Sequence, residues 1–159
     1  INISDIELFN ENNDSSINEL KKSKKKSGQG FGLSHKEKKI IENYAMKKYS
    51  DKMEKEGWVI NDVSAKKDKG FDLFLTKPGK KINAEIKGTT GSDEKVILTK
   101  NEVKFAKKNF PYSALIIVSG IHFDRSKDPP KASLGKIKEI YNWNLKDSDL
   151  EPINYYYST

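Results

Sequence analysis

Residues 71–88 read Phe-Asp-Leu-Phe-Leu-Thr-Lys-Pro-Gly-Lys-Lys-Ile-Asn-Ala-Glu-Ile-Lys-Gly, and this stretch decides the fold. Apolar and polar residues alternate on both sides of residues 77–80, whose central Pro-Gly pair favours a tight turn. The stretch therefore predicts a β-hairpin. A turn of this length also sets the pairing register, in which Asp72 lies directly opposite Glu85.

The alternation divides the hairpin into an apolar face and a charged face. The charged face carries Asp72, Glu85 and Lys87. The apolar face carries Phe71, Leu73, Leu75, Ile82, Ala84 and Ile86. Opposed side chains lie about 5 Å apart at Cβ, where two carboxylates repel by about 1 kcal/mol in water and about 3 kcal/mol at an effective dielectric of 20.

A cation between Asp72 and Glu85 would remove this repulsion, and carboxylates are ligands suited to Mg²⁺ or Mn²⁺. Lys87 lies on the same face, where it can stabilise charge at a reacting phosphate. The alternative is that these three side chains form cross-strand ion pairs on a solvated sheet face.

Helix signals flank the hairpin. A capping box at residues 34–37 opens a helical pattern that stops at Gly57, and a second capping box at residues 99–102 opens a helix that Pro111 ends. Strands are predicted at residues 58–63 and 113–119, and a closing strand at residues 154–157. The order α-β-β-β-α-β predicts an α/β fold, with a mixed sheet of four to five strands flanked by helices.

The composition excludes several classes of protein. The 159 residues contain no cysteine, which excludes disulfides, thiolate zinc sites and cysteine nucleophiles, and no run approaches the ~20 apolar residues of a membrane span. We therefore expect a cytoplasmic protein. The net charge of +7 comes almost entirely from lysine, with Arg125 the single arginine, which favours contact with the phosphates of a nucleic acid over reading of its bases.

We expect residues 1–30 to be the tether of a longer protein, because residues 21–30 are lysine-rich and have no apolar residue. Residues 31–159 are then the folded domain.

Asp72, a turn and the run Glu85-Ile86-Lys87 resemble the Asp…Glu-x-Lys core of the restriction-endonuclease-like, or PD-(D/E)xK, superfamily, although Phe71 stands where the superfamily's name has proline. Residues 31–157 more closely resemble the "protein NO VEIN, C-terminal" family. The stretches that carry this resemblance include Gly32-Leu33-Ser34, Glu56-Gly57-Trp58, Phe71-Asp72-Leu73, Glu85-Ile86-Lys87-Gly88-Thr89-Thr90, Leu98-Thr99-Lys100-Asn101-Glu102-Val103 and Leu150-Glu151-Pro152.

The resemblance implies a restriction-endonuclease-like core and a divalent-metal-dependent DNA endonuclease domain of a larger bacterial or archaeal restriction or defence protein. In that case Asp72 and Glu85 bind Mg²⁺ or Mn²⁺, water attacks the phosphodiester bond, and Lys87 assists. Glu42 occupies the place of an additional acidic residue, or is a solvated helix residue.

Phosphate contacts are expected from Thr89 and Thr90, which follow the Glu-x-Lys run, and from Lys100 and Asn101 near a helix N-terminus. The partners implied are DNA and the remaining domains or subunits of a larger defence system, with a homodimer possible and no membrane. A non-cleaving DNA-binding or targeting module of a multidomain ATPase or helicase protein is the alternative, and a protein-interaction domain is a third class.

Overall fold

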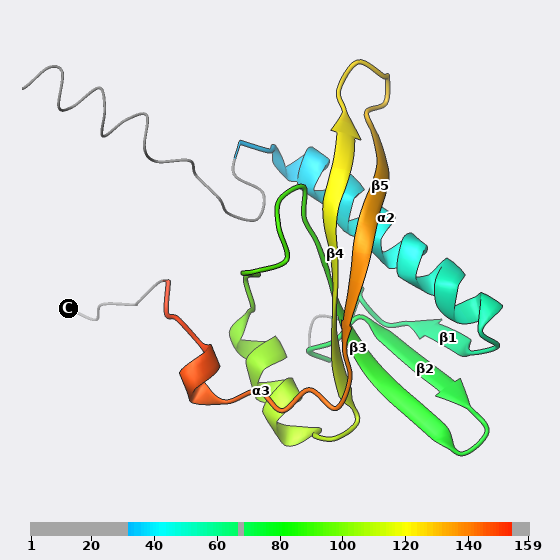
Figure 1. Cartoon of the computed structure of the whole chain (residues 1–159), viewed down its shortest axis with the longest axis vertical. Helices are drawn as coiled ribbons and strands as arrows, with labels where there is room; N and C mark the ends of the chain where they lie inside the picture. Colours follow the sequence, from blue (N-terminus) through cyan, green and yellow to red (C-terminus); the bar gives the residue numbers. More distant parts are fainter. Residues whose placement is uncertain (1–31, 67–68, 154–159) are drawn as a thin grey trace, which may run out of the picture.

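The computed structural model describes residues 32–66 and 69–153 (Figure 1). In this part of the chain the order is α2 (His35–Lys55), β1 (Val59–Asp62), β2 (Leu73–Lys77), β3 (Lys80–Gly88), α3 (Lys100–Lys108), β4 (Ser113–Asp124), β5 (Lys131–Ile140) and a 3₁₀ helix, η1 (Asp147–Asp149). The expected tether at residues 1–30 and the expected strand at residues 154–157 lie outside the described residues.

The strands form one five-stranded mixed sheet in the order β1-β2-β3-β4-β5. The β3–β4 pair is parallel and the other pairs are antiparallel. Leu73 pairs with Ala84 and Thr76 with Lys81, which confirms the predicted hairpin register for the paired residues 73–77 and 80–84. The predicted pair of Asp72 with Glu85 lies outside this ladder, because the N–H of Asp72 donates to Ala84 O. The α/β class and the mixed sheet flanked by helices are likewise confirmed.

Helix α2 covers one face of the sheet. Ser34 and Glu37 form the predicted capping box, and the buried residues of the helix recur every four positions. These residues are Ile41, Ala45, Tyr49 and Met53. They pack against alternate residues of the central strands, which include Leu73, Leu75, Ala84, Ile86, Ile116 and Val118. This is the main core, and it fixes α2 over β3 (Figure 1).

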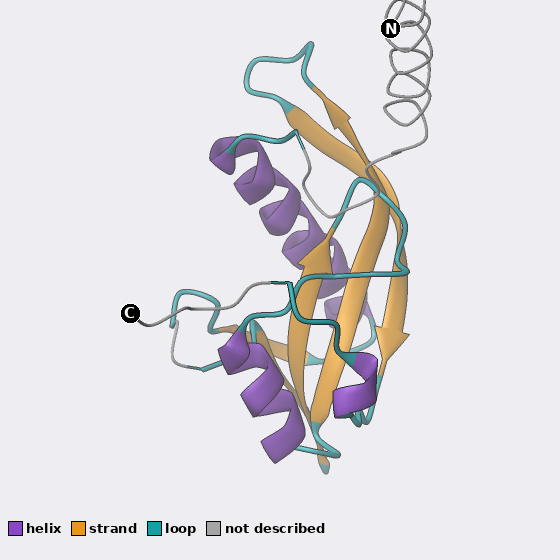
Figure 2. Cartoon of the chain, turned by 90° about the vertical axis from the view of Figure 1, so that its left-hand side faces the viewer, coloured by secondary structure: helices purple, strands orange, loops and turns teal. Residues whose placement is uncertain are grey.

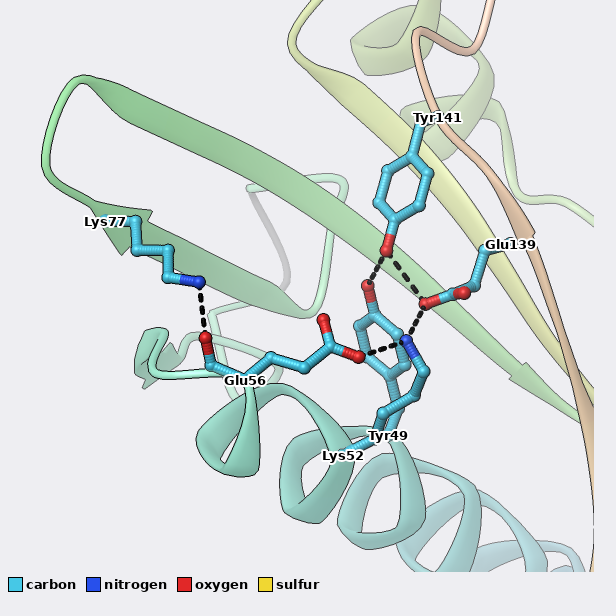
Figure 3. A network of polar contacts seen from close by, with 6 residues as sticks. All are labelled: Tyr49, Lys52, Glu56, Lys77, Glu139 and Tyr141. Carbon is cyan, nitrogen blue, oxygen red and sulfur yellow. Dashed lines mark hydrogen bonds and ion pairs between the residues drawn. The ribbon is translucent and has the colours of Figure 1, made fainter.

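A polar network joins the C-terminal half of α2 to β5 (Figure 3). Lys52 Nζ lies 2.8 Å from Glu139 Oε1 and 2.9 Å from Glu56 Oε1. The same Glu139 oxygen accepts from the hydroxyl of Tyr141, which lies 3.2 Å from that of Tyr49. Burial raises the pKa of Tyr49, so its hydroxyl stays protonated and available for this bond.

Helix α3 lies on the opposite face of the sheet, where Ala106 packs with Leu115, Ile117, Trp143 and Leu145. Phe71 also belongs to this side, because its ring stacks on Phe105 with the centroids 4.6 Å apart. The predicted place of Phe71, on the apolar face with Leu73 and Leu75, was therefore wrong, because those two residues pack against α2. The regular ladder begins only at Leu73, and the N–H of Asp72 donates to Ala84 O, so the strand alternation does not extend back to residue 71.

Strand β5 was not predicted, and β4 runs five residues beyond the predicted strand. The two form a long hairpin whose tip extends past the start of α2 (Figure 2). Ala132 and Ile137 of β5 both pack on the α2 side although they are five positions apart. Leu134 and Gly135, with φ of 61° and 85°, shift the alternation between them. A two-residue period cannot be recognised across such a break.

No helix among residues 32–66 and 69–153 has the length and apolar character to span a bilayer.

Candidate functional site

The site lies where β3 extends beyond the end of its pairing with β2. Strand β2 begins at Leu73, opposite Ala84, while β3 continues to Gly88. Ile86 lies beyond the last residue of β3 that pairs with β2, and its N–H donates to Asp72 Oδ2 at 2.8 Å. The carboxylate of Asp72 therefore replaces the missing strand partner, which places it at the open edge of β3.

Glu85 and Lys87 lie two residues apart on β3, on the face that α3 covers. Lys87 Nζ is 2.8 Å from Glu85 Oε1 and 2.8 Å from Glu102 Oε2 of α3. The exposed fractions of the three side chains are 5% for Glu85, 13% for Lys87 and 14% for Glu102. The lysine is thus held between carboxylates from a strand and from a helix.

A cleft of about 510 Å³ connects these side chains to solvent. Asp72, Glu85 and Lys87 line it together with residues from one side of α2, among them Glu42. The titratable side chains that line it are Glu42, Asp62, Asp72, Glu85, Glu102, Lys39, Lys47 and Lys87. With five carboxyl groups against three ammonium groups, the fully ionised cleft has a net negative charge that favours a bound cation.

The carboxyl groups of Glu85 and Asp72 resist ionisation in this environment. Burial raises the pKa of Glu85 to about 8, the charges of Asp72 and Glu102 add to the effect, and Lys87 opposes it. Burial also raises the pKa of Asp72, against the hydrogen bond from Ile86. Burial alone would lower the pKa of Lys87, but Glu85 and Glu102 raise it above its ordinary value, so the ammonium stays charged.

The donor set fits a cation that prefers oxygen ligands. Among the described residues, Ile86 N–H is the donor to Asp72 and Lys87 the donor to Glu85, so each carboxylate keeps an oxygen for another ligand. The same residues contain no group of three or more His, Cys, Asp and Glu side chains able to enclose a metal ion. Two carboxylates completed by water and phosphate oxygens are the usual ligands of Mg²⁺.

The structure brings Asp72, Glu85, Lys87 and Glu42 to one cleft, and Glu42 is exposed there beside Lys39 at 3.4 Å. The other predicted residues lie elsewhere. Thr89 is buried and its hydroxyl accepts from Gly91 N–H at 3.0 Å, while Thr90, Lys100 and Asn101 are exposed and do not line the cleft.

Sequence reasoning missed two acidic residues of the cleft, Asp62 and Glu102. Glu102 was recognised as part of a capping box, which is confirmed: its Oε2 accepts from Thr99 N–H at 2.9 Å. The same oxygen lies 2.8 Å from Lys87 Nζ, and the capping-box pattern does not predict this second contact. Asp62 ends β1, and its charge contributes to raising the pKa of Asp72.

Comparison with models of protein families matches residues 41–131 to the family described as "Protein NO VEIN, C-terminal". The chain belongs to this family. The matched residues contain α2 from Ile41 onward, the whole hairpin, α3 and β4. Every side chain named above as lining the cleft therefore lies in the matched part of the NO VEIN C-terminal domain, except Lys39. No curated protein and no solved structure matches the chain.

Proposed function

We propose that this NO VEIN C-terminal domain is a divalent-metal-dependent DNA endonuclease of the PD-(D/E)xK type, part of a larger cytoplasmic restriction or defence protein. The observation that carries the proposal is the meeting of Asp72 with the Glu85-Ile86-Lys87 run at the open edge of β3, inside a cleft. Asp72 comes directly before β2 and the Glu85-Ile86-Lys87 run lies on β3, so the hairpin brings the three charged side chains together.

Asp72 and Glu85 would hold Mg²⁺ or Mn²⁺, each through an oxygen to which no described residue donates. A cation bound there would supply Lewis-acid chemistry to the phosphodiester and to the attacking water. When its carboxyl groups are ionised, the cleft has a net negative charge that repels a DNA backbone, and the same cation would reduce this repulsion as the phosphate enters.

Lys87 would stabilise the charge that develops on the phosphate oxygens as the water oxygen bonds to phosphorus and the bond to one sugar oxygen breaks. Its pKa is raised, so its positive charge persists through the neutral range. The lysine-rich surface of the chain would hold DNA through its phosphates.

One observation favours the alternative, a non-cleaving DNA-binding or targeting module. Lys87 already pairs with both Glu85 and Glu102, so the three side chains neutralise much of their own charge without a metal. An array of this kind can have a purely structural role, in which it fixes α3 to the sheet.

Supercoiled plasmid DNA distinguishes the two functions. The nuclease predicts conversion to nicked or linear DNA with Mg²⁺ or Mn²⁺ and none with EDTA, and Asp72→Ala should abolish it while DNA binding persists. Metal-independent retardation of the plasmid on a gel, with no nicking under any condition, is the result expected of the module.

A further inference from the structure

We infer that Glu102 is a positioning residue that keeps the Lys87 ammonium off the metal-binding carboxylates. The inference rests on the proposed metal role of Asp72 and Glu85. It adds to that site a residue of α3 that lines the same cleft.

The geometry sets up a competition at Glu85. Lys87 Nζ lies at the same distance, 2.8 Å, from Glu85 Oε1 and from Glu102 Oε2. A metal cation bound to Glu85 and the ammonium of Lys87 would repel each other and would compete for the same carboxylate. Glu102 offers Lys87 a second partner, so that the lysine can stay charged and buried when Glu85 is occupied by a metal.

Without the charge of Glu102, Lys87 keeps Glu85 as its only charged partner at salt-bridge distance among the described residues. A charged ammonium that is only 13% exposed cannot stay unpaired at low cost, so it would bind Glu85 more closely and compete with the cation. Metal binding would then have to break this pair.

Glu102 itself is held in place by its helix. Its Oε2 accepts from the N–H of Thr99, and the hydroxyl of Thr99 accepts from the N–H of Glu102 at 3.3 Å. Phe105, one turn along α3, stacks on Phe71 next to Asp72. The start of α3 is thereby fixed to the segment that carries Asp72, and the distance between Glu102 and the metal-binding pair is set by packing.

Glu102→Gln separates the positioning of Lys87 from the capping of α3. Glu102→Gln keeps an acceptor for Thr99 N–H, since glutamine serves in a capping box, and removes the charge that holds Lys87. Thr99→Ala does the reverse, because it breaks the capping box and leaves the pair of Glu102 with Lys87 in place. Glu37→Gln is a matched control, in which the capping-box glutamate of α2 loses its pair with Arg125.

The experiment is calorimetric titration of the full chain with Mn²⁺ alone. Glu102→Gln should weaken Mn²⁺ binding about tenfold, the order expected for loss of one hydrogen bond to a charged group. Thr99→Ala should lower the thermal midpoint. Its Mn²⁺ affinity should stay within about twofold of that of the wild-type chain, because the substitution alters no contact to the metal site. Glu37→Gln should not change Mn²⁺ affinity.

The decisive comparison uses Lys87→Met, which removes the competing ammonium and keeps the apolar stem. In that background Glu102→Gln should no longer weaken Mn²⁺ binding, because there is no lysine to position. An equal loss of affinity in both backgrounds would mean that Glu102 acts only through its own charge, and would overturn the inference. Affinity unchanged by Glu102→Gln in the Lys87 background would overturn it as well and leave the proposed function standing. Absence of Mn²⁺ binding by the unchanged chain would overturn both.

Discussion

The buried carboxyl of Glu85 makes the metal-free domain less stable as the pH rises. Its pKa is raised to about 8 by burial first, and by the charges of Asp72 and Glu102, against an ordinary value of 4.5. The folded state therefore holds a proton that the unfolded chain releases between about pH 4.5 and pH 8. Stability is fully present below that window, falls as the pH rises through it, and levels off above pH 8.

The pH dependence of the free energy of unfolding follows from the one extra proton that the folded state binds. Where the folded state binds one proton more than the unfolded state, each pH unit lowers the free energy of unfolding by about 1.4 kcal/mol, so the fall between pH 6 and pH 8 is at most about 3 kcal/mol. This is a large part of the 5–15 kcal/mol typical of a domain. Glu85→Gln removes the titrating group and should remove most of the fall.

The assay is urea unfolding in EDTA at pH 6, 7 and 8 for the unchanged chain and for Glu85→Gln. Glu151→Gln is the control, since Lys95 lowers the pKa of that exposed carboxyl and its titration lies below the window. Glu151→Gln should keep the slope of the unchanged chain. A stability that is flat or rises from pH 6 to pH 8 in the unchanged chain, or a slope that survives Glu85→Gln, would refute the reasoning.

Three further outcomes are expected. Tyr49→Phe, which loses the hydrogen bond to Tyr141, should lower the free energy of unfolding by about 1 kcal/mol in urea denaturation, and no loss would contradict the role of the polar network. Gly88→Ala would set a Cβ 2.9 Å from the Cβ of Ala45, and should cost about 1–3 kcal/mol in the same assay, whereas Gly91→Ala, with ordinary contacts, should cost less. DNA binding should weaken with salt with a log–log slope of about −0.9 per phosphate contacted, and an affinity independent of salt would exclude lysine–phosphate contact.

The hairpin and its charged residues could be predicted because the information is local. Alternation and a short turn fix the register of the paired residues and the side of each residue within the strands, so Glu85 and Lys87 were placed together on one face. Phe71 was misplaced because the ladder ends between residues 72 and 73. The end of a strand depends on which neighbours continue past it, and that is a property of the sheet.

The parts that were missed depend on contacts between distant segments or on an irregular backbone. Strand β5 was not predicted because Leu134 and Gly135 interrupt the period that would identify it. Glu102 was recognised only as a capping residue, since its contact with Lys87 arises from the packing of α3 on β4 and Phe71. A capping box looks the same in sequence whether or not its glutamate has a second partner.

The nuclease account is tested most directly by the rate of plasmid nicking in Mg²⁺ or Mn²⁺ for Glu85→Ala. Folding should survive the change, because Lys87 keeps Glu102 as a partner, and the thermal midpoint measured alongside verifies this. Asp93→Ala, which breaks an exposed ion pair with Lys138 at 3.0 Å, is the matched control and should nick at the rate of the unchanged chain. The account predicts that Glu85→Ala is folded and inactive. Nicking by folded Glu85→Ala at the rate of the unchanged chain would contradict it.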